Sequence, residues 1–267
     1  MSPLRISGRS HVGRVRTSNQ DHYFVGVLHK SIEVCDTNLA VTEAVEEMSR
    51  LDADLLVVAD GVGGSRGGER ASQSAVFSLA TFIARTAACH YDPDVEQEDE
   101  FLRRLERALE YAHSVVRELA KQGRAPATTL TMAMVIGARA YIAHAGDSRA
   151  YHCRGARLRQ ITRDQTWANM LSDAGIAEPG GEQGNLSNVL LSAVGAQSME
   201  PAIGLVDLAP GDWLLLCSDG LTKHVADDAI AQMLSASEDP EAVTAQLVNA
   251  ALAGGGTDNV TVVAARA

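Results

Sequence analysis

Residues 138–162 have the sequence ARAYIAHAGDSRAYHCRGARLRQIT. Short apolar stretches alternate in this segment with two residue pairs that favour tight turns, Gly146-Asp147 and Arg154-Gly155. The segment therefore predicts consecutive strands joined by tight turns, which is a meander with antiparallel pairing.

The other apolar segments are also short, as is typical of strands. The predicted strands are Tyr23 to Leu28, Leu55 to Ala59, Thr129 to Ile136, Ala140 to Ala145, Trp213 to Cys217 and Val260 to Ala265. Apolar residues at helical spacing predict helices at about Glu69 to Ala88 and at Glu100 to Gln122. A further helix is expected between a capping Asp239, followed by Pro240, and Gly254. Blocks of strands and helices in this order favour a layered α+β fold.

Composition limits the class of protein. The 267 residues are 46% hydrophobic and show no linker or repeat, so one domain over residues 1–267 is expected. The net charge of -11 argues against nucleic-acid binding. The N-terminus lacks the apolar stretch of a signal peptide, and no apolar run approaches a membrane span, so we expect a cytoplasmic protein. The cysteines are widely spaced, which predicts reduced core residues at Cys35, Cys89, Cys153 and Cys217.

Four aspartates follow or precede apolar strands: Asp60, Asp147, Asp219 and Asp258. Any one of them could simply cap a turn. If the four converge, several buried anions would cost several kcal/mol each unless cations compensate them. Hard divalent cations are the expected partners, and oxygen ligands without a His/Cys cluster favour magnesium or manganese over zinc.

Two residues complete the expected site. Gly61 has no side chain, so its carbonyl can approach a cation beside Asp60. Arg16 precedes Gln20-Asp21 and could supply a planar fork for phosphate oxygens. Two ions that share a water would activate it for attack on phosphorus without a protein nucleophile.

Six segments in this order resemble the bacterial form of the PPM or PP2C-type metal-dependent protein phosphatases. The segments are RTSNQD (16–21), VVADGVGG (57–64), TTLTMAMV (128–135), AGDSRAY (145–151), CSDGL (217–221) and GGTDNVTVV (255–263). They span nearly the whole chain. The resemblance implies an αββα sandwich, with two antiparallel β-sheets flanked by helices, and hydrolysis of phosphoserine and phosphothreonine in phosphoproteins.

The resemblance also implies a role for each matched residue. Asp60 would bridge two Mg²⁺ or Mn²⁺ ions, the Gly61 carbonyl would bind one of them, and Asp219 and Asp258 would bind the other. Asp21 would hold a metal through water, and Asp147 would support a third, weaker site. Arg16 would bind phosphate, so the expected catalytic set is Arg16, Asp60 and Asp219. The implied partners are phosphoprotein substrates and a Ser/Thr kinase whose signalling the enzyme opposes, and a monomer is expected.

Three departures from the family pattern concern the leaving group and the substrate. Val62 replaces the histidine that follows the Asp-Gly pair in animal members, which leaves the leaving-group acid unassigned; the histidines considered are His22, His144 and His224. The segments Thr162 to Gln165 and Leu190 to Gly195 also differ from the usual motifs. Both flank the region expected to form a flap over the cleft, about residues 165–190.

Other interpretations compete with this one. His152-Cys153 and Arg159 fit the HCx5R pattern of cysteine-dependent phosphatases, although the intervening residues favour a hairpin rather than a helix. Glycines in Gly61 to Gly68 could suggest a nucleotide loop, but they lack the GK[ST] motif. A phosphatase-like binding or regulatory module without turnover is the non-enzymatic alternative. The insertion between Lys30 and Asp54 is expected to be a solvated helix, with a lid or an interaction surface as the alternatives.

Overall fold

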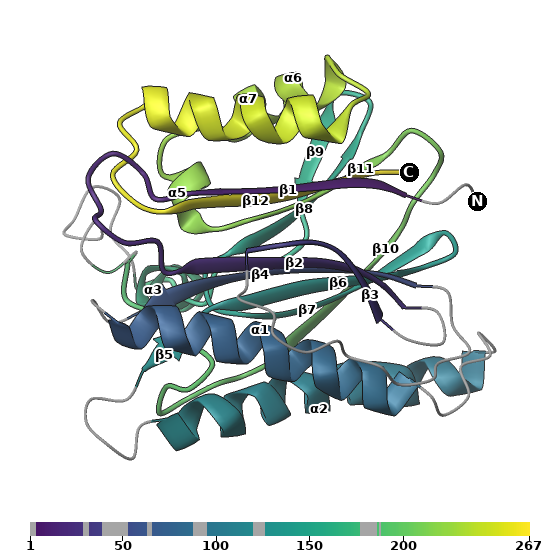
Figure 1. Ribbon diagram of the computed structural model, residues 1–267, viewed down its shortest axis with the longest axis vertical. Helices are drawn as coiled ribbons and strands as arrows, with labels where there is room; N and C mark the ends of the chain where they lie inside the picture. The colour runs from purple at the N-terminus through teal and green to yellow at the C-terminus, as the bar shows by residue number, and fades with distance from the viewer. Residues whose placement is uncertain are drawn as a thin grey trace.

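The computed structural model describes residues 4–28, 32–38, 53–62, 66–87, 95–119, 126–176, 186 and 188–267. Two antiparallel sheets lie face to face in the middle of the molecule, and helices cover both outer faces (Figure 1). The order of layers is therefore helix, sheet, sheet, helix. This confirms the expected α+β class and the αββα sandwich.

Within the described residues, one sheet has seven strands. Along its main path the order is β10 (Ala202–Asp207), β7 (Arg139–Ala145), β6 (Leu130–Ile136), β4 (Ala53–Val62), β2 (Asp21–Leu28) and β3 (Ile32–Thr37), and the short β5 (Ala127–Thr128) pairs with β4. The other sheet has five strands, in the order β1 (Arg5–His11), β12 (Val260–Arg266), β11 (Trp213–Cys217), β8 (Arg149–Arg154) and β9 (Arg157–Gln160).

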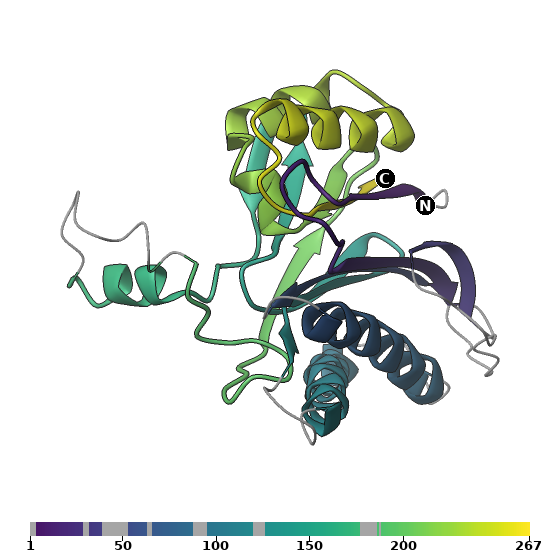
Figure 2. The same ribbon diagram turned by 60° about the vertical axis from the view of Figure 1, so that its left-hand side comes forward.

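Helices are divided between the two outer faces. The seven-stranded sheet is covered by α1 (Arg66–Ala87) and α2 (Val95–Glu118). The five-stranded sheet is covered by α5 (Asp219–Thr222), α6 (Asp227–Ser235) and α7 (Pro240–Ala253). The short α3 (Trp167–Asp173) lies in the expected flap region and projects away from the body of the molecule (Figure 2).

Three hydrophobic clusters match the three interfaces between these layers. Successive residues of β4 point to opposite faces of the sheet. Leu55 and Val57 therefore pack against α1 and α2, whereas Leu56 and Val58 belong to the cluster between the two sheets. The third cluster, which includes Trp213, lies between the five-stranded sheet and its helices. Both faces of the central strands are buried, which explains their almost continuous apolar sequences.

The helix boundaries follow from local chemistry. The side chain of Asp239 accepts hydrogen bonds from the N–H groups of Glu241 and Ala242, and Pro240 occupies the first turn of α7. Because proline lacks an N–H group and has a fixed φ, it suits this position. The predicted limits of this helix are confirmed.

The predicted meander is correct in part. The β8–β9 hairpin at Arg154-Gly155 forms as expected, but β7 and β8 belong to different sheets. At Gly146, where φ is +118°, the chain leaves the seven-stranded sheet and enters the five-stranded one. A Cβ at this position would lie 2.7 Å from the Cβ of Thr129, so glycine is needed for both conformation and space. The Gly146-Asp147 pair indicates that a strand ends here, but a turn within one sheet and a crossing between two sheets have the same local sequence pattern.

Three smaller expectations also need comment. The Lys30 to Asp54 segment is not simply a helix, because residues 32–37 form the edge strand β3 and β4 starts at Ala53; residues 39–52 lie outside the described residues. Cys153 and Cys217 are buried, as predicted, but Cys35 is exposed on β3, and Cys89 lies outside the described residues. None of the helices in the described part of the chain combines the length and the apolar composition needed to cross a lipid bilayer.

Candidate metal and phosphate site

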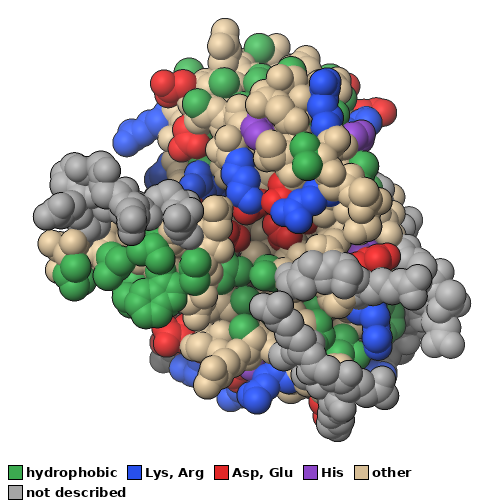
Figure 3. Space-filling view, turned by 90° about the vertical axis from the view of Figure 1, so that its left-hand side faces the viewer, with side chains coloured by type: hydrophobic (Ala, Val, Ile, Leu, Met, Phe, Trp, Pro, Cys, Tyr) green, Lys and Arg blue, Asp and Glu red, His purple; other side chains and the backbone are tan. Residues whose placement is uncertain are grey.

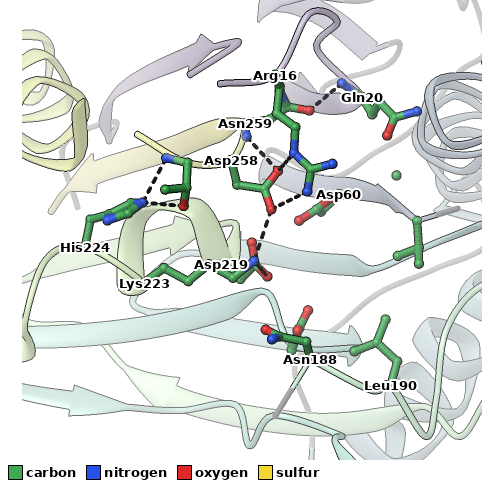
Figure 4. Close-up of a pocket in the computed structure, with 14 residues that line it drawn as sticks. Arg16, Gln20, Asp60, Asn188, Leu190, Asp219, Lys223, His224, Asp258 and Asn259 are labelled. Atoms are coloured by element: carbon green, nitrogen blue, oxygen red, sulfur yellow. Dashed lines mark hydrogen bonds and ion pairs between the residues drawn. The ribbon is translucent and has the colours of Figure 1, made fainter. Parts of the chain in front are cut away.

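A cleft of about 670 Å³ is lined by residues at the ends of strands from both sheets. Its lining includes almost every residue predicted for the site: Arg16, Asp60, Gly61, Asp147, Asp219 and Asp258. Figure 3 shows acidic side chains at the bottom of this hollow with basic side chains beside them, and Figure 4 shows the same residues in detail. The remaining predicted residue, Asp21, is buried beside Asp60 on the neighbouring strand.

Both sheets deliver carboxylates to the cleft. On the seven-stranded sheet, Asp21 begins β2 and lies opposite Asp60 near the end of β4. On the five-stranded sheet, Asp219 follows β11 as the first residue of α5, and Asp258 lies just before β12. Asp147 lies in the chain crossing between β7 and β8. The site therefore depends on the two sheets being packed together.

Burial raises the pKa values of three of these aspartates, Asp21, Asp60 and Asp147. The side chain of Asp21 is 1% exposed, and its burial raises the pKa to about 7, although a hydrogen bond from Ser218 opposes the shift. Burial also raises the pKa of Asp60 well above its usual range, and the charges of Asp21 and Asp219 add to this effect. Burial and the charge of Asp219 raise the pKa of Asp147 to about 7. The cleft thus concentrates negative charge that nearby protein cations only partly compensate.

Two basic side chains contact the carboxylates of the five-stranded sheet. Arg16 forms a two-point ion pair with Asp258, with its Nε 2.8 Å from Oδ1 and its Nη2 2.9 Å from Oδ2. The Nζ of Lys223 lies 2.5 Å from Oδ2 of Asp219 and 3.1 Å from Oδ2 of Asp258. Burial alone would raise the pKa of Asp258, but its contacts with Arg16 and Lys223 outweigh burial and hold that pKa below its usual value.

The donor set fits a hard divalent ion. Within the described residues, no three Asp, Glu, His or Cys side chains form a ready-made ligand group for one ion. Mg²⁺, however, is usually coordinated by only one or two carboxylates and keeps several water ligands. Oδ1 of Asp21 and Oδ1 of Asp219 are buried and have no hydrogen-bond partner among the described residues. Such oxygens are costly unless a cation or water satisfies them.

Residues that the sequence analysis did not single out hold Asp60 in place. The Thr129 Oγ1 accepts a hydrogen bond of 2.9 Å from the backbone N–H of Asp60, and the Thr128 Oγ1 donates one of 2.8 Å to its carbonyl. Gly61 is required by close packing, because a Cβ there would overlap the backbone of Gly68. The two threonines belong to the TTLTMAMV segment, which supplied the only signal for them.

Two further polar residues connect the sheets. The Ser218 Oγ, beside β11, donates a 2.8 Å hydrogen bond to Oδ2 of Asp21 on β2. The Asn259 side chain accepts a hydrogen bond from the N–H of Gln20 and donates to the carbonyls of Val12 and Ser18. These bonds fix the loop between β1 and β2, which carries Arg16, over the end of the five-stranded sheet.

The three histidines differ in their surroundings. His22 forms a hydrogen bond with Ser72, His144 forms one with Thr131, and burial lowers the pKa of both histidines to about 4. Both are buried away from the described lining of the cleft. His224 does line the cleft, where its Nε2 accepts a hydrogen bond of 3.0 Å from the N–H of Thr257.

Two residues of the Thr162 to Gln165 segment, which differs from the usual family motif, form well-defined contacts. Asp164 forms a two-point ion pair with Arg149, and Gln165 accepts a hydrogen bond from the N–H of Gly146 at the crossing between the sheets. A second cleft of about 1040 Å³ runs along α3. It shares part of its lining with the acidic cleft, namely Val62, Asn188 and Leu190.

The cysteine-phosphatase alternative does not fit the structure. His152 and Arg159 are cross-strand partners in the β8–β9 hairpin, so the intervening residues do not form a loop that leads into a helix. Cys153 is buried, and burial raises the pKa of its thiol. A nucleophilic cysteine needs the opposite shift. For the nucleotide-loop alternative, residues 63–65 lie outside the described residues.

Comparison with known proteins identifies the family of this chain. The sequence model of the protein phosphatase 2C family matches residues 44–253. The chain belongs to the protein phosphatase 2C family. It is similar to the serine/threonine protein phosphatase PstP of Mycobacterium tuberculosis (strain H37Rv), with 33% identity over 266 residues, which is 98% of this chain and 45% of PstP.

One further relative and one solved structure are similar to this chain over nearly their full length. Protein phosphatase PhpP of Streptococcus pneumoniae is 31% identical over 261 residues, covering 97% of this chain and 96% of PhpP. The crystal structure of the PstP catalytic domain in complex with 2 manganese ions has 31% identity and a TM-score of 0.71, covering 98% of this chain and 97% of that domain. The chain therefore spans less than half of full-length PstP but corresponds to its catalytic domain.

Proposed function

We propose that this chain is a metal-dependent serine/threonine protein phosphatase that hydrolyses phosphoserine and phosphothreonine in phosphoproteins. The observation that carries the proposal is the convergence of Asp60, Asp147, Asp219 and Asp258 on one cleft, with Asp21 buried beside Asp60. Several buried carboxylates with raised pKa values would be unfavourable in a purely structural role. Family membership supports the same activity.

The carboxylates would hold two Mg²⁺ or Mn²⁺ ions. Asp60 would bridge the ions, the Gly61 carbonyl would bind one, and Asp219 and Asp258 would bind the other. Asp21, which lies deeper, would act through water, and Asp147 would support a third, weaker site. When bound, the ions would lower the pKa of a shared water and neutralise charge on the phosphate. The two manganese ions of the PstP catalytic domain support this arrangement.

The protein's own residues would bind and orient the phosphate. Arg16 reaches the cleft from an anchored loop, and its side chain is 51% exposed, so it can turn from Asp258 to a phosphate dianion. A guanidinium fork matches two phosphate oxygens in the way that it now matches the Asp258 carboxylate. Val62 lies at the cleft and cannot donate a proton, and His224 is the histidine that lines the described part of it.

The partners follow from this chemistry. Phosphoproteins would be the substrates, and a Ser/Thr kinase that phosphorylates the same targets would be the opposing enzyme. We also propose that residues 1–267 work as one phosphatase domain, because the ligands come from residues 21 to 258 and from both sheets, and that this domain acts as a monomer. Names of relatives, such as serine/threonine protein phosphatase PstP, support the substrate class.

Hydrolysis of p-nitrophenyl phosphate and of a phosphothreonine peptide with Mn²⁺, with and without EDTA, tests the proposal. Loss of turnover with EDTA and in Asp60→Asn is expected, with full activity in Cys153→Ser. The matched control is Asp228→Asn, which removes the same charge at an exposed position in the first turn of α6. Turnover that resists EDTA and disappears in Cys153→Ser would favour a thiolate mechanism. A folded protein without turnover in any of these assays would favour a binding module.

A further inference from the structure

Lys223 occupies an unusual place in the acidic cleft. It follows the four-residue helix α5 and lies four residues after Asp219, so its side chain returns toward that carboxylate. Its Nζ lies 2.5 Å from Oδ2 of Asp219 and 3.1 Å from Oδ2 of Asp258 (Figure 4). One ammonium group therefore bridges the two carboxylates that we propose as the ligands of one divalent ion.

The oxygens of these two carboxylates are nearly all occupied by protein cations. Both oxygens of Asp258 contact Arg16, and Oδ2 also contacts Lys223. On Asp219, Oδ2 contacts Lys223, while Oδ1 has no hydrogen-bond partner among the described residues. An ion that is to bind both carboxylates must therefore displace a protein cation from Asp258, which is Arg16 at Oδ1 and both Arg16 and Lys223 at Oδ2.

We propose that Lys223 is an internal competitor for the divalent cation at Asp219 and Asp258, and that it sets the affinity of this half of the metal centre. The inference rests on the proposed phosphatase function. An ammonium group and a divalent ion repel each other strongly when both lie against the same two carboxylates. We therefore expect binding of the ion at this position to release Lys223 from the two carboxylates.

The two halves of the centre are unequal in this respect. Asp60 and Gly61 have no basic side chain among their contacts in the described structure, apart from the more distant charge of Arg16. The ion beside Asp60 would therefore bind without displacing an ion pair, whereas the ion at Asp219 and Asp258 would bind more weakly. Stepwise loading of the two ions follows, with the Asp60 position filled first.

Displacement would also change the environment of the substrate. The side chain of Lys223 is 33% exposed and lines the same cleft as Arg16. Once released from the two carboxylates, its ammonium group would remain at the cleft, where a phosphate dianion is the complementary partner. Lys223 would thus exchange a carboxylate contact for a phosphate contact when the second ion binds.

Calorimetric titration of the metal-free protein with Mn²⁺ tests the inference, with free Mn²⁺ followed independently by electron paramagnetic resonance. The wild type should show a tight and a weak class of ion. In Lys223→Gln the weak class should become about tenfold tighter, equivalent to about 1.4 kcal/mol, and the tight class should stay unchanged. Lys223→Arg, which keeps the charge, should retain the weak class.

The matched control for net charge is Arg159→Gln. Arg159 is exposed on β9 and lies outside the described lining of both clefts, so its replacement should leave both classes unchanged. Equal tightening of both classes in Lys223→Gln would indicate a general field effect and would overturn the inference. An unchanged or weakened weak class would overturn it as well.

A measurement on the wild type does not depend on the folding of any variant. Brief acetylation followed by mass spectrometry reports the reactivity of Lys223 relative to Lys30 and Lys121, the other lysines of the sequence. Saturating Mn²⁺ should increase the relative labelling of Lys223, because the amine leaves its two carboxylates. Equal or lower labelling would contradict the inference. If the wild type bound no Mn²⁺, the proposed function itself would fail, which distinguishes the two cases.

Discussion

Asp21 and Asp60 lie directly opposite each other on adjacent strands of the seven-stranded sheet. Like charges at opposed positions destabilise a sheet, and burial increases the cost because water cannot screen them. Ser218, which follows a strand of the other sheet, donates a hydrogen bond of 2.8 Å to the carboxylate of Asp21, but it does not neutralise the charge. The pair therefore lowers the stability of the metal-free protein and favours the binding of cations.

Removing one charge of this pair should stabilise the protein in EDTA. For Asp21→Asn at pH 8 we expect the free energy of unfolding to rise by about 2 kcal/mol, because the amide can still accept the Ser218 hydrogen bond without a buried charge. The gain from added Mn²⁺ should shrink in the variant. Thermal unfolding with EDTA and with Mn²⁺ measures both effects, and a lower melting temperature in EDTA would contradict this account.

Arg16→Ala should act mainly on phosphate binding. We expect KM for a phosphothreonine peptide to rise roughly tenfold with a smaller change in kcat, because the arginine binds the dianion before and during reaction. Stability should change by less than about 1 kcal/mol, since the ion pair with Asp258 is half exposed at Arg16. Arg14→Ala removes the same charge from an exposed position in the same loop and serves as the control. An unchanged KM would exclude Arg16 from the site.

Gly220→Ala should disturb the site through the backbone. A Cβ at Gly220 would overlap the backbone oxygen of Asn259, so α5 and the preceding strand end must move, and Asp219 with them. We expect a loss of about 2 kcal/mol or more in stability, together with reduced turnover. In contrast, Gly67→Ala in α1 meets only Pro126 at 3.8 Å and should be neutral or slightly stabilising. Urea denaturation and activity assays compare the two variants, and similar effects would refute the steric explanation.

The buried histidines should make stability depend on pH. In the folded protein burial lowers the pKa of His22 and His144 to about 4, below the ordinary value of 6.5. The unfolded chain therefore binds protons more readily between these values, and the stability contributed by the neutral imidazoles is complete above pH 6.5 and is lost as the pH falls toward 4. Each histidine can contribute up to about 3 kcal/mol.

This pH effect can be isolated by difference. His144→Gln should lose less stability than the wild type between pH 7.5 and 5 in urea denaturation, whereas His11→Gln, at an exposed position, is the control for removing a histidine. In NMR titrations the ring signals of His22 and His144 should remain constant from pH 8 to about 5. A ring signal that shifts near pH 6.5 would disprove the assignment for that histidine.

Strong local patterns predicted much of the fold. The strand at Trp213–Cys217 and the helix at Pro240–Ala253 were predicted at the observed positions, because a continuous apolar run and a complete set of capping residues mark them. The edge strands β1, β3 and β10 were missed. With the sequence RISGRSH, β1 has many polar residues and is only partly buried, so its place is determined by pairing with β12 rather than by its own periodicity.

In the site, too, residues marked by local sequence were predicted, whereas residues placed by long-range packing were not. The aspartates at strand ends were predicted because each belongs to a recognisable segment, and the structure brings them to one cleft. Ser218 and Lys223 were not singled out, since their contacts depend on packing between distant segments and between the two sheets. The i, i+4 spacing of Asp219 and Lys223 was the one available signal for the lysine.

The delivery of carboxylates from both sheets has a mechanical consequence. Sliding or separation of one half of the sandwich relative to the other would disrupt the coordination shell before either half loses its own hydrogen-bonded strands. Ions in the cleft would then cross-link the two sheets at one end of the apolar layer that contains Leu56 and Leu216. The hydrogen-exchange rate of amides in the strands that border this layer would then fall when manganese is bound. The concentration of free divalent ions in the cell would set the free energy needed to separate the two sheets.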